Sequence, residues 1–230
     1  MQRRGFLRLT GRSILATILL AVVPGTAALA ATSGQAGAQL GAFFRAVQMD
    51  DARTVKSLLA AGVNPNQPNP AGGEPALVLA VREGSMRVFQ ALLDHPGIQL
   101  DAPALNGNTA LMMAAFKRNR AAVEALIARG ADVNRAGWTP LHYAAAGGDE
   151  DIARLLLKRG AQVDAVSPPA SGSLTPLMMA AREGQLAMAV FLLGQGANPR
   201  LANSEGLTPV QIAERAERKD IAAAIREHSK

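Results

Sequence analysis

Apolar positions recur along this chain with the same internal spacing in six successive segments. In the segment that starts at Thr139, a small residue (Ala144) follows after five positions and a glycine (Gly160) after 21. Between them, two large aliphatic residues lie 17 and 18 positions from the start. The other segments start at Gly41, Pro75, Thr109, Thr175 and Thr208. Consecutive starts are 34, 34, 30, 36 and 33 residues apart, so length varies between segments and not within them. This regularity predicts a stack of repeated units.

Each segment is expected to form two short antiparallel helices. In three segments the first helix begins at a Thr-Pro pair, where threonine can accept hydrogen bonds from the free amides of the first turn and proline has no amide to lose. These pairs are Thr139-Pro140, Thr175-Pro176 and Thr208-Pro209. In the fourth segment the second helix is expected over Asp149–Arg159, and Gly160 should end it in a left-handed conformation. One helix pair cannot bury its apolar face alone, so consecutive pairs must share a core.

Three sequence stretches now identify a family resemblance. Residues 139–145 (TPLHYAA), 155–161 (LLLKRGA) and 130–134 (GADVN) resemble the ankyrin repeat, and the similarity extends over about residues 40 to 228. The resemblance implies an all-α ankyrin-repeat solenoid of about six helix-turn-helix units joined by short β-hairpin fingers. A generic alanine-rich helical bundle is the alternative. The repeat domain is expected at 40–230, with units near 41–74, 75–108, 109–138, 139–174, 175–207 and 208–230.

The turn between the two helices usually holds glycine nine positions after the start of a unit. Three segments follow this pattern, whereas the other three carry Asp50, Arg118 and Glu217 at that offset. Aspartate tolerates a left-handed backbone better than arginine does. Arg118 is therefore expected either to be strained or to lie in an altered turn. The polar run at 214–220 suits the outer face of a terminal repeat.

Residues 1–30 have the layout of a cleavable export signal. A basic start precedes an apolar run at 14–23, and small residues offer a cleavage site between Ala30 and Ala31. The run is too short to span a membrane. The stretch RRGFLR at 3–8 resembles the twin-arginine signal, with a general secretory signal as the alternative. The residues that carry this resemblance are Arg3, Arg4, Phe6 and Leu7. Residues 31–39 are expected to form a short flexible linker, and the lack of cysteine excludes lipoprotein anchoring.

Removing this segment changes the charge of the chain. It holds four arginines and no acidic residue, so the remainder has 24 − 4 = 20 basic and 18 acidic residues, a net charge of +2. Nucleic-acid binding, which needs a basic stripe with stacking aromatics, loses its support. The lack of cysteine also excludes disulfides and fits a periplasmic fold that is stabilised by packing alone.

Residues with catalytic or metal-binding chemistry are scarce. His95, His142 and His228 lack metal-ligand spacing, and His142 occupies the position of a structural histidine in the ankyrin repeat. No nucleophile elbow or phosphate-binding loop is present. The carboxylate clusters at 50–51 and 149–151 lie where acids stabilise helix starts, so we interpret them as caps rather than as general acids or bases.

Two methionine pairs occupy matching offsets, at 112–113 and 178–179. Thioethers can bind Cu(I), but these offsets lie inside the stack, where methionine fills gaps. Core packing is the preferred interpretation. We therefore expect no enzyme activity, no metal and no cofactor.

A partner would bind where side chains are free of the repeating pattern. The resemblance implies a concave groove formed by offsets seven and eight of the first helices, together with the finger tips. Trp138 could anchor a partner, or could instead fold back over its own finger. The candidate residues are Trp138, Phe116, Lys117, Arg118, Arg135, Arg82, Glu83, Arg182, Glu183, Leu174 and Leu207.

The sequence thus predicts an exported, periplasmic, non-catalytic module that binds a protein partner through its groove and fingers. We expect a monomer that binds no nucleic acid and has no stable membrane anchor once the signal is cleaved. A host-directed secreted ankyrin effector is one alternative, and a metal-binding or enzyme accessory protein is another.

Overall fold

The computed structural model describes residues 25–229, and the side chains of residues 35–229. The chain divides into two compact units, Met1–Gln35 and Ala36–Lys230, and the fold below concerns the second unit. In the first unit, the backbone of residues 25–35 is helical. The expected signal residues Arg3, Arg4, Phe6 and Leu7 lie outside the described residues, so that prediction stays open.

Twelve α-helices and one short 3-10 helix make up the regular structure of residues 25–229. The first helices of the six pairs are α1 (Gly25–Gln48), α3 (Ala76–Glu83), α5 (Ala110–Phe116), α7 (Pro140–Gly147), α9 (Pro176–Glu183) and α11 (Pro209–Arg215). The second helices are α2 (Ala52–Ala60), α4 (Met86–Leu93), α6 (Arg120–Ala128), α8 (Glu150–Lys158), α10 (Leu186–Gly194) and α12 (Lys219–His228). The 3-10 helix is η1 (Pro169–Ser171).

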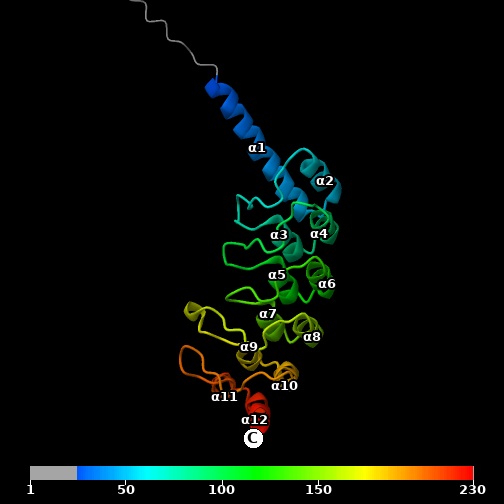
Figure 1. The fold of residues 1–230 in the computed structure, drawn as a ribbon. Helices are drawn as coiled ribbons and strands as arrows, with labels where there is room; N and C mark the ends of the chain where they lie inside the picture. The colour runs from blue at the N-terminus through cyan, green and yellow to red at the C-terminus, as the bar shows by residue number, and fades with distance from the viewer. Residues whose placement is uncertain (1–24, 230) are drawn as a thin grey trace, which may run out of the picture. The chain divides into compact units, whose positions relative to one another are not determined.

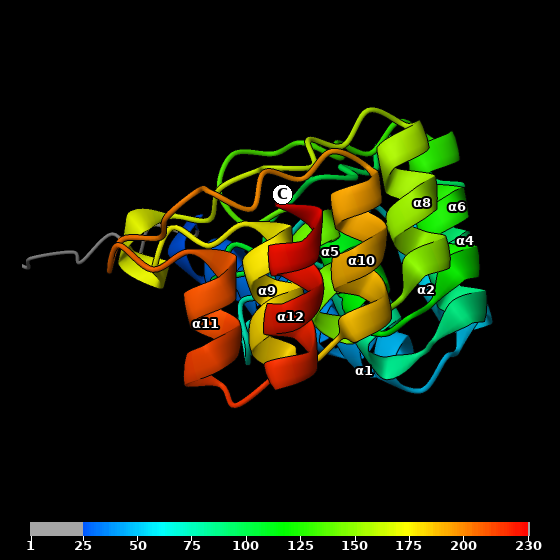
Figure 2. The ribbon, with the colours of Figure 1, turned by 90° about the horizontal axis from the view of Figure 1, so that it is seen from below.

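The helix pairs stack in two rows, as Figure 1 shows. In one row α3 contacts α5, α5 contacts α7, α7 contacts α9 and α9 contacts α11. In the other, α2 contacts α4, α6 contacts α8, and α10 contacts both α8 and α12. The connecting loops extend to the side away from the second row (Figures 1 and 2). The predicted all-α repeat solenoid is therefore confirmed.

The repeating residues form one continuous core. Ala144 and Ala145 are fully buried, so α7 can lie close to both of its neighbours in the first row. Leu156 of α8 is also fully buried, and a side chain of that size contributes about 1.5–3 kcal/mol when it leaves water. Each helix pair thus buries its apolar side chains against the next pair, as the spacing predicts.

The loops between pairs are fingers without strands. They span residues 61–75, 94–109, 129–139, 159–175 and 195–208, here called the first to fifth fingers. Four of them are closed by a single backbone hydrogen bond of 2.9–3.0 Å, as between the Ala104 amide and the Asn108 carbonyl. One pair of this kind does not make a ladder, so the expected β-hairpins are turns among the described residues. In the long fourth finger, η1 takes up the additional residues.

The turn between the two helices keeps its shape whatever residue occupies it. Asp50, Arg118 and Glu217 have φ angles of 51°, 54° and 59°, all in the left-handed region that the glycines of the other units adopt. Of the two expectations for Arg118, strain is therefore correct and an altered turn is not. A non-glycine residue in this region costs on the order of 1 kcal/mol.

Residues 31–39 differ from the expected flexible linker. They are helical, because α1 runs without interruption through them and through the backbone of Ala30 and Ala31. The segment contains no proline, and its three alanines favour a helix, whereas its two glycines oppose one. Within residues 25–229, no helix combines the length and the apolar character that a membrane span requires. Signal cleavage remains a prediction.

Polar side chains connect each finger to the next one. In four fingers, an Asn or Asp side chain accepts a hydrogen bond from a backbone amide of the following finger at 2.8–3.0 Å. These side chains are Asn66, Asp101, Asn134 and Asp164. Asn134 also donates from Nδ2 to the Gly160 carbonyl at 2.6 Å. The stack is thus held by a polar ladder as well as by its core.

Candidate functional site

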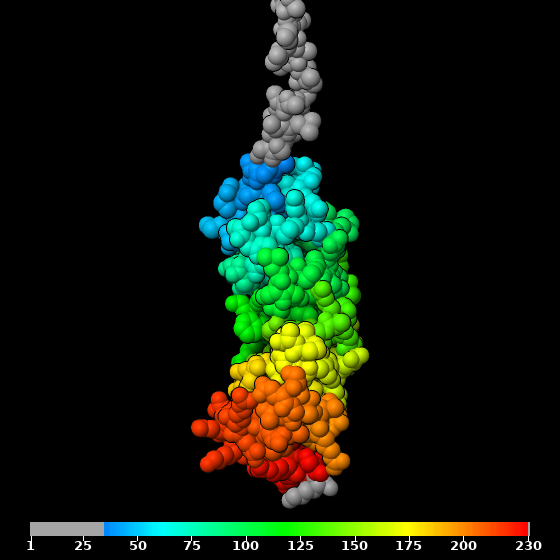
Figure 3. Space-filling view, turned by 90° about the vertical axis from the view of Figure 1, so that its left-hand side faces the viewer, coloured from blue at the N-terminus to red at the C-terminus, as the bar shows by residue number. Residues whose placement is uncertain are grey.

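The surface formed by the fingers and the first helices carries the candidate residues. We call it the groove face, and its helical part consists of the residues seven and eight positions after the start of each unit. The residues at offset seven are Gln48, Arg82, Phe116, Ala146, Arg182 and Arg215. Figure 3 shows this side of the molecule, where the segments of the repeat unit follow one another as layers in chain order.

Three aromatic side chains meet at the middle of the groove face. Phe116 of α5 packs edge-on against Tyr143 of α7, with ring centroids 6.1 Å apart, and remains 57% exposed. Trp138 lies 5.2 Å from His142 and 6.2 Å from Tyr143, measured between ring centroids. Its indole Nε1 donates to the Ser171 hydroxyl in the fourth finger at 3.3 Å. Trp138 therefore packs onto α7 and the next finger, and Phe116 is the more accessible aromatic residue.

The charged candidates differ in the groups of this chain that they contact. Arg82 pairs with Glu74 at 2.8 Å and with Glu83 at 3.2 Å. Arg118 donates to the Gly147 carbonyl, and Arg135 donates to the Asp101 carbonyl at 3.1 Å, so both connect neighbouring units.

Lys117 is exposed. It is the C-cap of α5, directly after Phe116. A cation beside an exposed ring suits a partner that carries both apolar and acidic groups.

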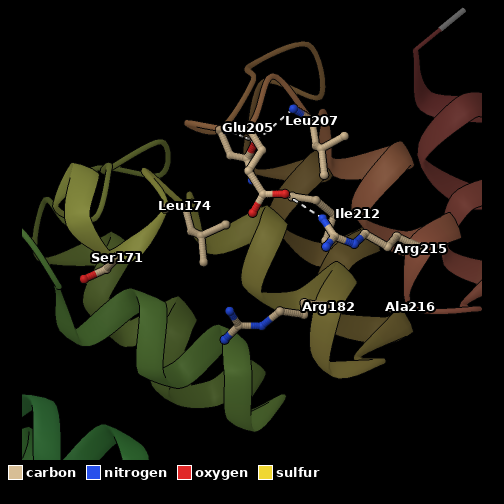
Figure 4. A pocket seen from close by; sticks show the side chains of 10 residues that line it. Ser171, Leu174, Arg182, Glu205, Leu207, Ile212, Arg215 and Ala216 are labelled. Atoms are coloured by element: carbon tan, nitrogen blue, oxygen red, sulfur yellow. Dashed lines mark hydrogen bonds and ion pairs between the residues drawn. The ribbon is translucent and has the colours of Figure 1, made fainter.

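A cleft of about 280 Å³ lies between the fourth and fifth fingers, above α9 and α11 (Figure 4). Arg182 reaches it from α9, and Ile212 and Arg215 line it from α11. Arg182 Nε donates to Glu183 at 2.9 Å, and Arg215 Nη1 donates to Glu205 at 2.6 Å. The cleft thus combines charged groups with an apolar wall.

The apolar wall of the cleft includes two predicted finger residues. Leu174 is only 6% exposed, so most of its side chain belongs to the core and only its edge lines the cleft. Leu207 is half-buried and lines the same cleft. The prediction missed Arg215 and Glu205. Arg215 lies at offset seven of the last unit, so applying the offset rule to that unit would have found it.

His142 is fully buried and holds the middle of the stack together. Its Nδ1 lies 3.1 Å from the Thr139 amide and 2.8 Å from the Thr139 hydroxyl, while Nε2 lies 2.9 Å from the Leu174 carbonyl. A neutral ring with the proton on Nε2 satisfies all three contacts. Burial lowers the pKa of His142 to about 4, although the hydrogen bond to Leu174 acts in the opposite direction. The predicted structural role of this histidine is supported by its geometry.

The carboxylate clusters cap helices. Asp51 accepts from the Thr54 amide at 3.1 Å, and Asp149 accepts from the Ile152 amide at 3.0 Å. Asp50 accepts a hydrogen bond from the Val88 amide of the next unit at 2.9 Å and forms an ion pair with Arg87 at 2.8 Å. Partial burial would raise the pKa of Asp50, but these hydrogen bonds outweigh it and the pKa lies below its ordinary value.

The methionine pairs lie within the stack. Met112 and Met178 are buried, and the Met178 Sδ accepts from the Thr175 amide at 3.4 Å. Among the described residues, no group of three or more His, Asp or Glu side chains could hold a metal ion. Met179 is also buried and Met113 is half-buried against the core, so burial supports the core-packing interpretation of both pairs.

Comparison with known proteins places this geometry in a family. A model of ankyrin repeats in three copies matches residues 43–136 and 96–167, and a model of many copies matches residues 166–213. The transient receptor potential cation channel subfamily A member 1 of Homo sapiens is 32% identical over 160 residues, 66% of this chain and 14% of that protein. The palmitoyltransferase Hip14 of Drosophila melanogaster is 41% identical over 95 residues, 40% of this chain and 15% of that protein.

A solved structure agrees with these matches. An ankyrin repeat domain from Acinetobacter baumannii AYE superposes with a TM-score of 0.68 at 25% identity, covering 81% of this chain and 97% of that chain. This chain spans less than a fifth of the length of the two curated relatives above. Because two family models and a solved structure match the paired helices and fingers, the chain belongs to the ankyrin-repeat family, whose repeats generally mediate protein–protein interaction.

Proposed function

We propose that this chain is an exported, periplasmic, non-catalytic protein that binds a partner protein through its groove face. The observation that carries the proposal is a contrast in burial within one helix: the side chain at offset five is buried, whereas the side chain at offset seven is exposed. In α5, Ala114 is fully buried, whereas Phe116 is 57% exposed. Binding a partner would remove the apolar surface of this exposed ring from water, and aromatic anchors of this kind often dominate interfaces.

The groove face suits binding because it is built on paired helices. The capped helices and the ladder between fingers hold the exposed side chains in place. Preformed surfaces lose little conformational entropy when they bind, so more of the contact energy is available for affinity. The carboxylates near the groove face act as caps or ion-pair partners, which supports a binding role over an enzymatic one.

The partner-binding proposal is tested by crosslinking in intact cells, followed by mass spectrometry of the proteins captured. We expect Phe116→Ser to reduce recovery of the specific partner at least fivefold, because one aromatic anchor is commonly worth more than 1 kcal/mol. Val190→Ser is the matched control, since Val190 is also exposed but lies on α10 in the second row. Equal recovery from both variants would contradict a role for the groove face.

Export rests on the sequence of residues 1–30 alone. We expect the wild-type protein to be found in processed form in the periplasm. Replacing Arg3 and Arg4 by lysines should block this export if the twin-arginine route is used. Continued export of the variant would exclude that route and favour the general secretory one. Protein recovered from culture fluid would instead favour the host-directed effector.

A further inference from the structure

Three units place an arginine at offset seven of the groove face, and their surroundings differ. These residues are Arg82, Arg182 and Arg215. Arg82 and Arg182 have the same neighbour at offset eight, Glu83 and Glu183, and each arginine pairs with it at 3.2 and 2.9 Å. The two units are therefore directly comparable.

The comparison shows one carboxylate missing from the fifth unit. In the second unit, Glu74 lies just before the start of the first helix and accepts from Arg82 Nη2 at 2.8 Å. The residue at the same position in the fifth unit is Leu174, which is apolar. Arg182 thus lacks the finger carboxylate that its counterpart has.

The Arg182 guanidinium has donors to spare. Its ion pair with Glu183 uses Nε. A guanidinium presents five N–H donors in a planar fork that matches a carboxylate. Figure 4 shows the Arg182 head group extending beneath Leu174 at the cleft. The free edge of the guanidinium therefore faces a space that a ligand can enter.

The remaining walls of the cleft define what would accompany a carboxylate. Glu205 is the only acidic residue that lines the cleft, and it forms an ion pair with Arg215, with 2.6 Å between Nη1 and Oε2. Leu174, Leu207 and Ile212 supply apolar surface. A carboxylate with an aliphatic neighbour would satisfy both kinds of wall, and an isolated anion would leave the apolar wall uncovered.

We propose that the cleft between the fourth and fifth fingers binds an acidic side chain of an extended partner segment, next to an aliphatic residue. The ligand carboxylate takes the place beside Arg182 that Glu74 takes beside Arg82. This inference rests on the proposed function, because it assigns the chemistry of the partner segment that the groove face recognises.

The test uses the full-length, isotope-labelled chain and two synthetic peptides that differ at one position. Each peptide is Gly-Gly-Leu-Val-X-Leu-Gly-Gly with blocked ends, where X is glutamate or glutamine. Nuclear magnetic resonance titration gives the affinity and identifies the arginine Nε–H signals that shift. We expect the glutamate peptide to bind about fivefold more tightly at low salt, which is the range of a partly exposed ion pair, and the preference to shrink at high salt.

Arg182→Gln should abolish the preference for glutamate. Arg159→Gln, which removes the same charge at the C-cap of α8, should preserve it. Equal affinity for the two peptides, no binding of either at millimolar concentration, or a preference that survives Arg182→Gln would overturn the inference.

The failure of this inference can be distinguished from failure of the proposed function. If partner capture in cells depends on Phe116 while the glutamate preference does not depend on Arg182, the groove face binds a partner of other chemistry. If neither substitution has an effect, both proposals are wrong.

Discussion

Replacing His142 by methionine should change how the stability of the protein depends on pH. The chain offers methionine as a matched residue, because Met112 and Met178 occupy the same offset in the third and fifth units. Met178 is fully buried and its sulfur accepts from the helix-capping threonine, so methionine fits this environment. The substitution removes the titrating group and the hydrogen bond to the Leu174 carbonyl.

The magnitude follows from the lowered pKa of His142, about 4 against an ordinary value of 6.5. Above pH 6.5 the ring is neutral in both states, and the variant should be less stable by about 1 kcal/mol, the usual net value of one hydrogen bond. As pH falls from 6.5 to 4, the histidine of the unfolded wild type binds a proton, whereas the buried ring of the folded protein stays neutral. Wild-type stability should therefore fall by roughly 3 kcal/mol over this window, at 1.36 kcal/mol per pH unit.

Urea denaturation followed by far-ultraviolet circular dichroism, at intervals between pH 7.5 and 4, measures the effect. We expect the free-energy difference between wild type and His142→Met to shrink as pH falls and to reverse sign near pH 6, where the wild type has lost about 1 kcal/mol. Near pH 4 the variant should be the more stable protein by about 2 kcal/mol. Contributions from other titrating groups, including Asp50, are common to both proteins and cancel in the difference. A difference that is independent of pH would refute the argument that burial keeps His142 neutral.

Three further predictions concern the turns and the ladder, each checked by the same denaturation assay. Asn134→Ala removes two hydrogen bonds to the fourth finger and should cost about 1–2 kcal/mol, whereas Asn198→Ala, whose side chain bonds only within its own finger, should cost less. Glu217→Gly relieves a φ of 59° and should stabilise by about 1 kcal/mol, while Glu227→Gly within α12 should destabilise by a similar amount. Asp50→Asn should destabilise the protein at neutral pH, because the hydrogen bonds that lower the pKa of Asp50 stabilise its carboxylate. With the assay extended to about pH 2, the difference should shrink as pH falls below 3.8 and the carboxylate takes up a proton.

The sequence predicted the helix pairs well because their determinants are local. The second helix expected at Asp149–Arg159 is observed as Glu150–Lys158, with the two flanking residues as its caps. The fixed spacing of apolar residues also located the core, since the aliphatic and alanine positions must face the neighbouring pair to be buried.

Features that depend on register between units were not predictable in this way. The hydrogen bonds of Asp50 with Val88 and of Asn134 with the fourth finger join residues more than 25 positions apart, and no local pattern specifies them. The same limit applies to the cleft, where Arg182 and Arg215 become neighbours only after stacking. Arg118 shows the opposite case, because the packed helices impose a turn that its own preference opposes.

Trp138 gives the protein an intrinsic optical probe with a restricted view. It is the only tryptophan, and its indole contacts α7 and the fourth finger. In a stack where each unit contacts only its neighbours, the ends can open before the middle does. Tryptophan emission should therefore report opening between the third and fourth units, whereas circular dichroism averages over all helices. The separation between the two unfolding curves would measure how strongly the ends of the stack are coupled to its centre.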